Sequence, residues 1–250
     1  SGVRTGRAGV RAGRRPDGVV RLADGPPPGR DTADGTPGSV RACGTGAAGE
    51  GLPRPHRAVH AGRVLEPPEP DCRLHPALEA RPSPIAGTGL FTRDPVAAGT
   101  VVIRFGGRLV TWAELQELFA EAARQPDRPY VDTIAVTEAW HLVLPARRTA
   151  GYSNHSCDPN LWWTGPYTLA ARRDIPAGAE VTSDYATSTA DPDFTVDCAC
   201  GAPGGLCRGT VTGADWRLPE LRRRYGDHWT PALLTRIRRT YGETWTPGGA

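Results

Sequence analysis

Short apolar runs separated by glycine, proline and other turn-forming residues fill the middle of the chain, and this pattern predicts strands. Between residues 85 and 110, the β-branched run Val101–Phe105 follows such a turn, as short strands commonly do. Two apolar runs joined by a turn predict a hairpin over 129–145, and the segments 161–173 and 180–184 predict further strands. The fold class that follows is mainly β.

Helical periodicity is confined to a few places. Thr111 and Glu114 have the spacing of a capping box, and apolar residues follow at i, i+3, i+4 and i+7, so the sequence predicts an amphipathic helix over 112–124. Apolar stripes predict two more short helices, over Trp216–Tyr225 and Pro231–Thr240. We expect these two to form a C-terminal helical extension, with their arginines solvated and matched to the helix dipoles.

The first 70 residues differ in composition from the rest of the chain. They contain no Phe, Trp, Tyr or Ile, and 24 of the 70 are Gly or Pro. Such a segment buries too little apolar surface to offset the entropy of ordering it. We expect residues 1–70 to be a disordered Arg/Gly/Pro-rich tail, without the apolar run of a signal peptide, and residues 71–84 to be an extended lead-in.

Charge is distributed unevenly. The chain has no lysine, and residues 1–70 carry 11 Arg against 7 acidic residues, whereas residues 71–250 carry 19 Arg against 20. A folded part this close to neutral argues against strong nucleic-acid binding. No apolar run approaches the length of a membrane span. We therefore expect an intracellular, soluble protein without membrane contact, cytoplasmic, or nuclear if the source is eukaryotic.

The candidate chemistry gathers in residues 152–160, Tyr-Ser-Asn-His-Ser-Cys-Asp-Pro-Asn. Both asparagines of the chain, Asn154 and Asn160, lie here. Side-chain amides that both donate and accept suit a binding site, although these residue types also build plain turns. Six cysteines are present, and Cys198-Ala-Cys200 with Cys207 close behind favours a metal site over a disulfide scaffold.

Taken together, Gly87-Thr-Gly89, the Asn-His-Ser-Cys segment, the residues 178–185 that end in Asp-Tyr, and the late cysteines resemble the SET domain. This is the protein-lysine methyltransferase family that uses S-adenosylmethionine, and the resemblance covers roughly residues 82–209. It implies small, β-clip-like sheets around a pseudoknot that brings the Asp-Tyr segment against Asn-His-Ser-Cys. The implied division is a SET domain over 71–190, a post-SET zinc module over 191–212 and the helical extension over 213–250.

The resemblance also implies roles for individual residues. Tyr185 matches the catalytic tyrosine, and the expected acceptor is a lysine of a protein substrate. The expected S-adenosylmethionine contacts are Gly87, Thr88, Gly89, Tyr152, Asn154 and His155, with His155 structural. A structural Zn²⁺ is expected on Cys157, Cys198, Cys200 and Cys207. Tyr130, Trp163 and Ser183 are candidates for the substrate channel.

The sequence departs from the family pattern in places. Six residues separate Cys200 from Cys207, where the family usually has four. Ser183 stands where many members have Phe or Tyr. Two alternatives stay open. A non-catalytic SET-like module that binds a protein partner would lack the tyrosine hydroxyl or the cofactor motifs. A zinc-ribbon nucleic-acid binder would show a second metal-ligand pair and a basic folded surface. The motifs favour the enzyme.

Overall fold

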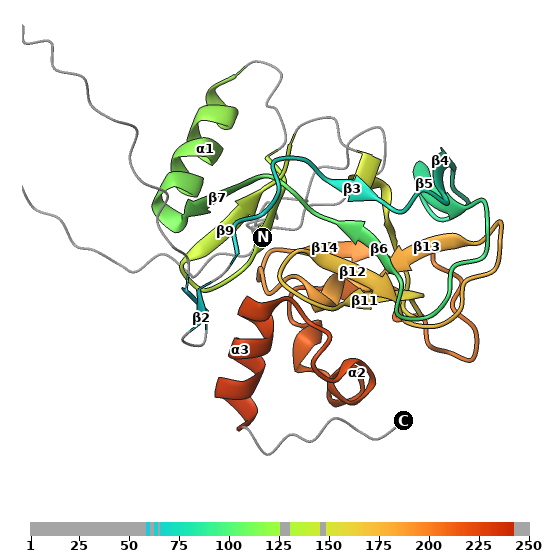
Figure 1. The fold of residues 1–250 in the computed structure, drawn as a ribbon. Helices are drawn as coiled ribbons and strands as arrows, with labels where there is room; N and C mark the ends of the chain where they lie inside the picture. The colour runs from blue at the N-terminus through green and yellow to red at the C-terminus, as the bar shows by residue number, and fades with distance from the viewer. Residues whose placement is uncertain (1–58, 61–62, 65, 126–130, 146–148, 243–250) are drawn as a thin grey trace, which may run out of the picture.

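The strands of this protein form several small sheets instead of one large sheet (Figure 1). The computed structural model describes residues 59–60, 63–64, 66–125, 131–145 and 149–242. The prediction of a mainly β fold built from short strands is confirmed. None of the helices in this described part of the chain combines the length and apolarity that a membrane crossing needs.

One four-stranded sheet carries the motif segments, in the order β10-β13-β5-β4. The bounds of these strands are Asn154–His155, Glu180–Ser183, Thr88–Thr92 and Leu78–Pro82. β4, β5 and β13 pair antiparallel, whereas β10 runs parallel to β13. Parallel neighbours need a long connection, and here that connection contains two strands of the next sheet.

A second four-stranded sheet has the order β11-β12-β6-β3 and is antiparallel throughout. The bounds are Leu161–Trp163, Thr168–Ala171, Val101–Arg104 and Arg73–Leu74. The strand pair predicted over 161–173 is confirmed as β11 and β12. Every residue of β12 is buried, because this strand has a neighbour on each side.

The third sheet, β7-β9-β8, supports the first helix. The bounds are Arg108–Thr111 for β7, Trp140–Val143 for β9, Thr133–Ala135 for β8 and Trp112–Arg124 for α1. The Thr111 hydroxyl accepts a bond from the Glu114 N–H, and the Glu114 carboxylate accepts one from the Thr111 N–H. The predicted capping box and helix are confirmed. In Figure 1, α1 lies at the opposite end of the molecule from α2.

A first hydrophobic core draws side chains from all three sheets. Its fully buried members include Leu90, Val102, Ile103, Val136, Leu142 and Val181. Burying one such side chain contributes roughly 1.5–3 kcal/mol. Because each sheet supplies only a few of them, the three sheets depend on one another for their stability.

A second hydrophobic core joins the C-terminal segment to the motif region. The surrounding elements are the hairpin β14 (Thr195–Asp197) and β15 (Thr210–Thr212), the 3₁₀ turns η2 (Tyr185–Thr187) and η3 (Asp215–Arg217), and the helices α2 (Pro219–Tyr225) and α3 (Pro231–Tyr241). The buried side chains are Cys157, Tyr185, Ala186, Phe194, Val211, Trp216, Leu221, Tyr225, Trp229, Leu233 and Ile237. The two C-terminal helices therefore share a core with the motif residues.

One predicted helix begins later than expected. The sequence predicted a helix over Trp216–Tyr225, but η3 ends at Arg217 and α2 begins at Pro219. Leu218 between them is extended, with φ −68° and ψ 122°, because proline disfavours the helical conformation in the residue before it. The helix predicted over Pro231–Thr240 is confirmed as α3.

The described part of the chain also includes residues before the expected tail boundary at residue 70. Two short strands precede it, β1 (Val59–His60) and β2 (Arg63–Val64), and they pair antiparallel. The main-chain carbonyl of Glu66 accepts a hydrogen bond from the buried Tyr167 hydroxyl at 3.1 Å. Such main-chain contacts leave no mark on composition, so the sequence did not reveal them. Residues 1–58 of the predicted tail lie outside the described residues.

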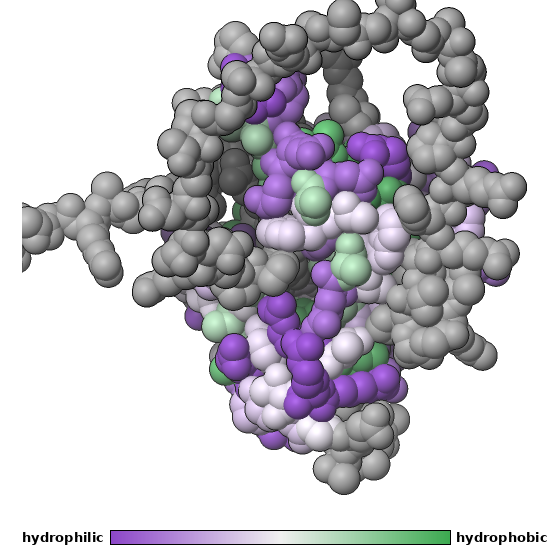
Figure 2. All heavy atoms as spheres, turned by 90° about the vertical axis from the view of Figure 1, so that its left-hand side faces the viewer, coloured by the Kyte–Doolittle hydropathy of each residue, from purple (hydrophilic) through white to green (hydrophobic). Residues whose placement is uncertain are grey.

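The surface on the left-hand side of Figure 1 is mainly hydrophilic, as Figure 2 shows. Among the described residues, the exposed large hydrophobic side chains are Val101, Leu206 and Tyr241. Two of the C-terminal arginines pair within the fold, Arg238 with Asp227 and Arg239 with Glu138. Isolated exposed apolar residues such as Val101, Leu206 and Tyr241 are ordinary on a protein surface.

Candidate functional site

The Asn-His-Ser-Cys segment lies against the segment that leads to Tyr185. β10 and β13 pair in parallel, with His155 opposite Ser183. The Ser156 N–H extends this ladder by donating to the Ser183 carbonyl at 3.1 Å. Two segments that are distant in the sequence are thereby fixed side by side, as the resemblance implied.

Asn160 bonds along β13 through both ends of its amide. Its Nδ2 donates to the Glu180 carbonyl at 2.8 Å, and its Oδ1 accepts from the Thr182 N–H at 2.9 Å. A carboxylate would lack the donor, and a longer side chain would not keep the same reach. The amide at this position therefore acts as a substitute strand partner for β13.

Asn154 and Glu180 together hold the loop that contains the Gly-Thr-Gly turn. The Asn154 Nδ2 donates to Glu180 Oε1 at 2.7 Å and lies within bonding distance of the carbonyls of Ala86 (3.1 Å) and Thr88 (3.3 Å). The Ser83 hydroxyl donates to the same carboxylate at 2.8 Å. Sequence analysis missed the roles of Ser83 and Glu180, because these side chains meet across 97 positions of the chain.

Both glycines of the turn are required by its geometry. Gly87 has φ +49°, a left-handed conformation that glycine adopts at little cost. A Cβ on Gly89 would lie 2.2 Å from Glu180 Oε1, far inside van der Waals contact. The shape of the turn and the position of the Glu180 carboxylate therefore depend on each other.

Tyr185 is buried where these segments meet. Its side chain is 7% exposed, its hydroxyl donates to the Ser153 carbonyl at 3.1 Å, and its N–H donates to His155 Nδ1 at 3.3 Å. Burial and the nearby Glu180 charge raise the pKa of the phenol well above its usual value. The hydroxyl is thus protonated at neutral pH. In the described part of the chain, the buried Ser153 hydroxyl has no hydrogen-bond partner.

His155 links Tyr185 to the cysteines. Burial, against the opposing effect of the Asp184 charge, lowers the pKa of its imidazole to about 4. The ring is therefore neutral at pH 7. Because Nδ1 accepts from the Tyr185 N–H, the proton lies on Nε2, which is 3.3 Å from Cys157 Sγ. A neutral histidine in this position donates to sulfur and serves a structural role.

Asp184 is a fully buried carboxylate next to Tyr185. Burial raises its pKa, but hydrogen bonds and charge from Arg208 outweigh burial and hold the pKa below its usual range. The two Arg208 Nη atoms donate at 2.6 and 2.8 Å, and the Tyr225 hydroxyl donates at 2.9 Å. The Ala186 N–H donates to Asp184 Oδ1 at 3.0 Å, which caps the turn η2. Sequence analysis singled out neither Asp184 nor Tyr225.

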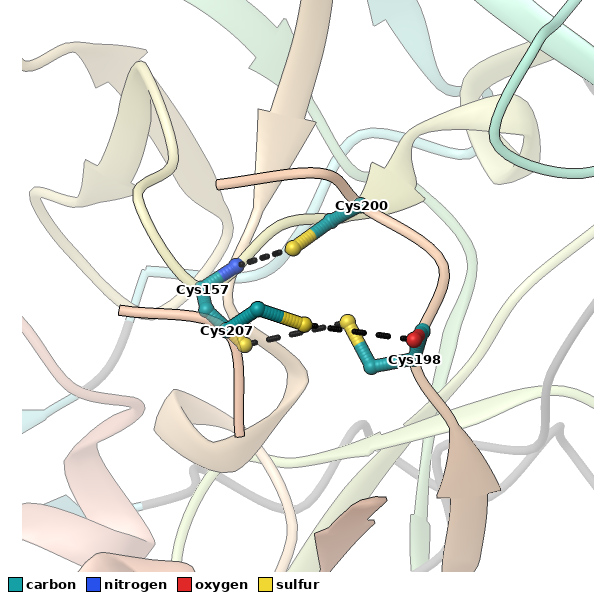
Figure 3. A group of neighbouring side chains, drawn as sticks. All are labelled: Cys157, Cys198, Cys200 and Cys207. Carbon is teal, nitrogen blue, oxygen red and sulfur yellow. Dashed lines mark hydrogen bonds between the residues drawn. The ribbon is translucent and has the colours of Figure 1, made fainter. Parts of the chain in front are cut away.

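Four cysteine side chains converge from three parts of the chain (Figure 3). Cys157 follows β10, Cys198 and Cys200 follow β14, and Cys207 precedes β15. All four sulfur atoms lie within 4.8 Å of one another, and the Sγ atoms of Cys157 and Cys198 are 3.7 Å apart. A tetrahedral zinc site with Zn–S bonds of about 2.3 Å has sulfur–sulfur distances of about 3.8 Å. The cluster fits such a metal ion.

The longer gap before Cys207 forms a turn that keeps the cysteine in the cluster. Gly201, Gly204 and Gly205 all have positive φ, between 63° and 72°, so the additional residues fold outward without strain. The Leu206 N–H closes a turn on the Pro203 carbonyl at 3.2 Å. The departure from the family spacing is accommodated by glycine.

The thiols differ in their tendency to ionise. Burial raises the pKa of Cys157 to about 11, whereas main-chain N–H groups of Cys157 and Ala202 outweigh burial at Cys200 and lower its pKa to about 7. Four thiolates this close repel one another, and a divalent cation is the counter-charge that removes the repulsion. The donor set therefore favours a soft divalent metal.

A family model described as "SET domain" matches residues 87–186. Residues 87–186 are therefore similar to a SET domain. The match begins at the Gly-Thr-Gly turn and ends one residue after Tyr185. Cys198, Cys200, Cys207 and the C-terminal helices lie beyond the matched residues.

Known SET proteins show the same likeness over part of their length. The Drosophila melanogaster "Histone-lysine N-methyltransferase ash1" is 29% identical over 156 residues, which is 58% of this chain and 7% of that protein. The Mycosarcoma maydis "Histone-lysine N-methyltransferase, H3 lysine-4 specific" is 33% identical over 147 residues, 52% of this chain and 9% of that protein. This chain thus spans less than a tenth of the length of either relative.

A solved structure, the methyltransferase domain of human "Histone-lysine N-methyltransferase SETMAR", superposes with a TM-score of 0.42 and 23% identity. The superposition covers 54% of this chain and 58% of that one.

The structure describes two of the three candidate channel residues, Trp163 and Ser183. Trp163 is 3% exposed and stacks on Phe105 with ring centroids 5.6 Å apart, within the first core. Ser183 ends β13 and is half-buried, and Tyr152 is half-buried against the first core. Tyr130 lies outside the described residues. Their roles in binding stay predictions.

Proposed function

We propose that this protein transfers a methyl group from S-adenosylmethionine to the ε-amine of a lysine in a protein substrate. The carrying observation is the buried, protonated Tyr185 hydroxyl, which donates to the Ser153 carbonyl within the residues that match the SET family. The Tyr185 N–H donates to His155 Nδ1 and fixes the main chain beside it. The names of the curated relatives support a protein lysine as the acceptor. A histone is the first substrate to test, because both relatives are named for histone lysines.

The residues proposed to bind S-adenosylmethionine are Gly87, Thr88, Gly89, Tyr152, Asn154 and His155. The cofactor supplies a methyl group that is already activated on a sulfonium. Asn154 supports binding indirectly, since its amide holds the main chain of Ala86 and Thr88 in place. The absence of a side chain on Gly89 leaves room for the Glu180 carboxylate, which accepts from Asn154.

The acceptor lysine must enter the site as the neutral amine, because an ammonium has no lone pair. Burial of the lysine among apolar side chains lowers its pKa. Tyr185 is not a base for this step, because its own pKa is raised. Its hydroxyl is proposed to orient the amine, and Tyr130, Trp163 and Ser183 are proposed to line the approach.

We propose Zn²⁺ as the metal on Cys157, Cys198, Cys200 and Cys207. The charge and size of the ion suit four thiolates in a tetrahedron. All four ligand positions come from the protein, so the role is structural. Cys157 belongs to the Asn-His-Ser-Cys segment, so a metal here would tie residues 198–207 to the proposed cofactor site. The four cysteines are free thiols in the structure, and a thiolate site suits a reducing, intracellular compartment.

Calorimetry with S-adenosylmethionine, together with metal analysis of the same sample, tests the proposal. We expect a Kd in the range of about 1–100 μM and about one zinc per chain. Folded, zinc-loaded protein that gives no binding heat and no transfer would overturn the enzyme assignment. That result would favour the non-catalytic, protein-binding SET-like module.

A further inference from the structure

Tyr225 lies outside the residues that match the SET family, yet it reaches the residue that precedes Tyr185. It is the last residue of α2 and is 1% exposed. Its hydroxyl donates to Asp184 Oδ2 at 2.9 Å. A hydrogen bond between a buried phenol and a buried carboxylate is stronger than one between neutral groups.

Asp184 connects Tyr225 to the turn that begins at Tyr185, because it accepts hydrogen bonds from both. Its side chain has no solvent exposure, so each of its lone pairs needs a donor from the protein. Oδ2 receives bonds from Arg208 and Tyr225, and Oδ1 receives bonds from Arg208 and from the Ala186 N–H. The last of these bonds begins the turn η2, in which Tyr185 is the first residue.

Two further bonds fasten the same helical segment around that turn. Arg224 donates to the Cys157 carbonyl at 2.6 Å, and the Thr230 N–H donates to the Thr187 carbonyl at 3.0 Å. Thr187 is the last residue of η2. The segment from Arg224 to Thr230 therefore contacts both ends of η2, Asp184 at the start and Thr187 at the end. It also contacts the Asn-His-Ser-Cys segment through Cys157.

We propose that Tyr225 is a positioning residue for the methyl transfer, acting through Asp184 on the position of Tyr185. This inference rests on the proposed function, and it assigns α2 and α3 to the catalytic unit. Loss of the Tyr225 hydroxyl leaves one Asp184 lone pair without its donor and loosens the turn.

The variant Tyr225→Phe removes the hydroxyl and keeps the ring. Steady-state kinetics should show an about tenfold lower kcat, with the KM for S-adenosylmethionine within about twofold of wild type. The zinc content should not change. Tyr241→Phe is the matched control, because it removes a hydroxyl from the end of the neighbouring helix α3 at an exposed position. A Tyr225→Phe enzyme with wild-type kcat would overturn the proposal, even if its Tm were lower.

Hydrogen exchange separates this inference from the proposed function. The amides of residues 186–188 should exchange faster in Tyr225→Phe, while those of β5 should not change. If the wild-type protein transfers no methyl group, the proposed function fails, and this exchange pattern still decides whether Tyr225 holds the turn. Unchanged exchange would overturn the inference. Should Tyr225→Phe not fold, Arg208→Lys removes a donor from the same carboxylate, and the same losses are expected.

Discussion

Tyr185 is held by its neighbours without being deprotonated by them. Its hydroxyl has a carbonyl partner at Ser153, its N–H has a partner at His155, and its pKa is raised by burial and by Glu180. A phenol in this state donates a hydrogen bond and does not accept a proton. This state suits the proposed orientation of an amine and does not suit general base catalysis.

Replacing Tyr185 by Phe should therefore abolish most turnover and leave cofactor binding intact. We expect kcat to fall by about 100-fold or more, with the Kd for S-adenosylmethionine within about twofold of wild type by calorimetry. Tyr167→Phe is the control, because its hydroxyl bonds to Glu66 away from the motif segments. Equal turnover of Tyr185→Phe and wild type would remove Tyr185 from the mechanism.

The pH dependence of the wild-type rate follows from the same pKa. The raised pKa of Tyr185 means that this residue causes no fall in rate below about pH 10. The rate should instead rise with pH as the substrate lysine loses its proton. A bell-shaped kcat profile with its descending limb near pH 8, retained in saturating substrate, would contradict this assignment.

Gly89→Ala tests the contact between the Gly-Thr-Gly turn and Glu180. The new Cβ would lie 2.2 Å from the carboxylate, so either the turn or Glu180 must move. Overpacking of this kind costs about 1–3 kcal/mol, and we expect S-adenosylmethionine binding to weaken by about tenfold or more. Gly165→Ala is the matched control, since its Cβ would meet only Thr168 Oγ1 at 3.2 Å. Equal affinity in both variants would show that the turn does not contribute to binding.

At the scale of elements, α1 contacts its sheet through an aromatic pair, the half-buried Trp112 and the buried His141. Trp112 at the start of α1 packs against His141 of β9, with ring centroids 5.4 Å apart. His141 is 1% exposed, and neither ring nitrogen has a hydrogen-bond partner in the described part of the chain. Burial lowers its pKa to about 4. The contact therefore requires a neutral histidine, and the role of His141 is packing.

This contact should make stability depend on pH below neutrality. Between the unfolded pKa of about 6.5 and the folded pKa of about 4, the unfolded chain binds the proton and the folded chain does not, so stability falls as pH falls. From pH 7 to pH 5, wild type should lose about 2 kcal/mol more unfolding free energy than His141→Phe. Denaturant titrations at both pH values measure this difference. Parallel losses in the two proteins would contradict the buried neutral state.

Local patterns in the sequence were enough to predict most elements. The box of Thr111 and Glu114 located α1, and glycine and proline located the strand ends, because these signals act within a few residues. The break between η3 and α2 could have been predicted from Pro219, because a proline acts locally on the residue before it, here Leu218. The meeting of Ser83 with Glu180, and of Tyr225 with Asp184, could not be predicted, since neither pair has a local signal.

The sequence predicted only those residues of the candidate site that belong to recognisable motifs. Resemblance brought Tyr185, the Gly-Thr-Gly turn and the four cysteines into one hypothesis, and the structure places the four sulfur atoms together. The residues that support these groups, such as Glu180 and Asp184, are common acidic residues on short strands or turns. Their contacts form only when the sheets are assembled, which buries Asp184 and half-buries Glu180.

At the scale of the whole molecule, two hydrophobic cores meet at the motif segments. The first contains the three sheets, and the second contains Cys157, Tyr185 and the C-terminal helices. The cysteine cluster lies at the edge of the second core, with Cys198, Cys200 and Cys207 packed against it. A metal ion there would stabilise the second core as a unit.

Removal of the metal should therefore loosen the C-terminal half more than the sheets. Cys200→Ser, or treatment of wild type with a chelator, should release about one zinc per chain and lower the Tm. Cys72→Ser is the control, because Cys72 lies outside the cluster near Gly106. Hydrogen exchange should rise in α2 and α3 before it rises in β5 and β6. A fully metallated and active Cys200→Ser protein would contradict the four-cysteine site.

The most direct test is mass spectrometry of a lysine-containing protein, with core histones first, after incubation with this protein and S-adenosylmethionine carrying an isotopically labelled methyl group. The account predicts labelled methyl-lysine with wild type and almost none with Tyr185→Phe of equal zinc content. Labelled methyl groups on another residue type, or equal labelling by the two proteins, would contradict the proposed lysine methylation with Tyr185 in the site.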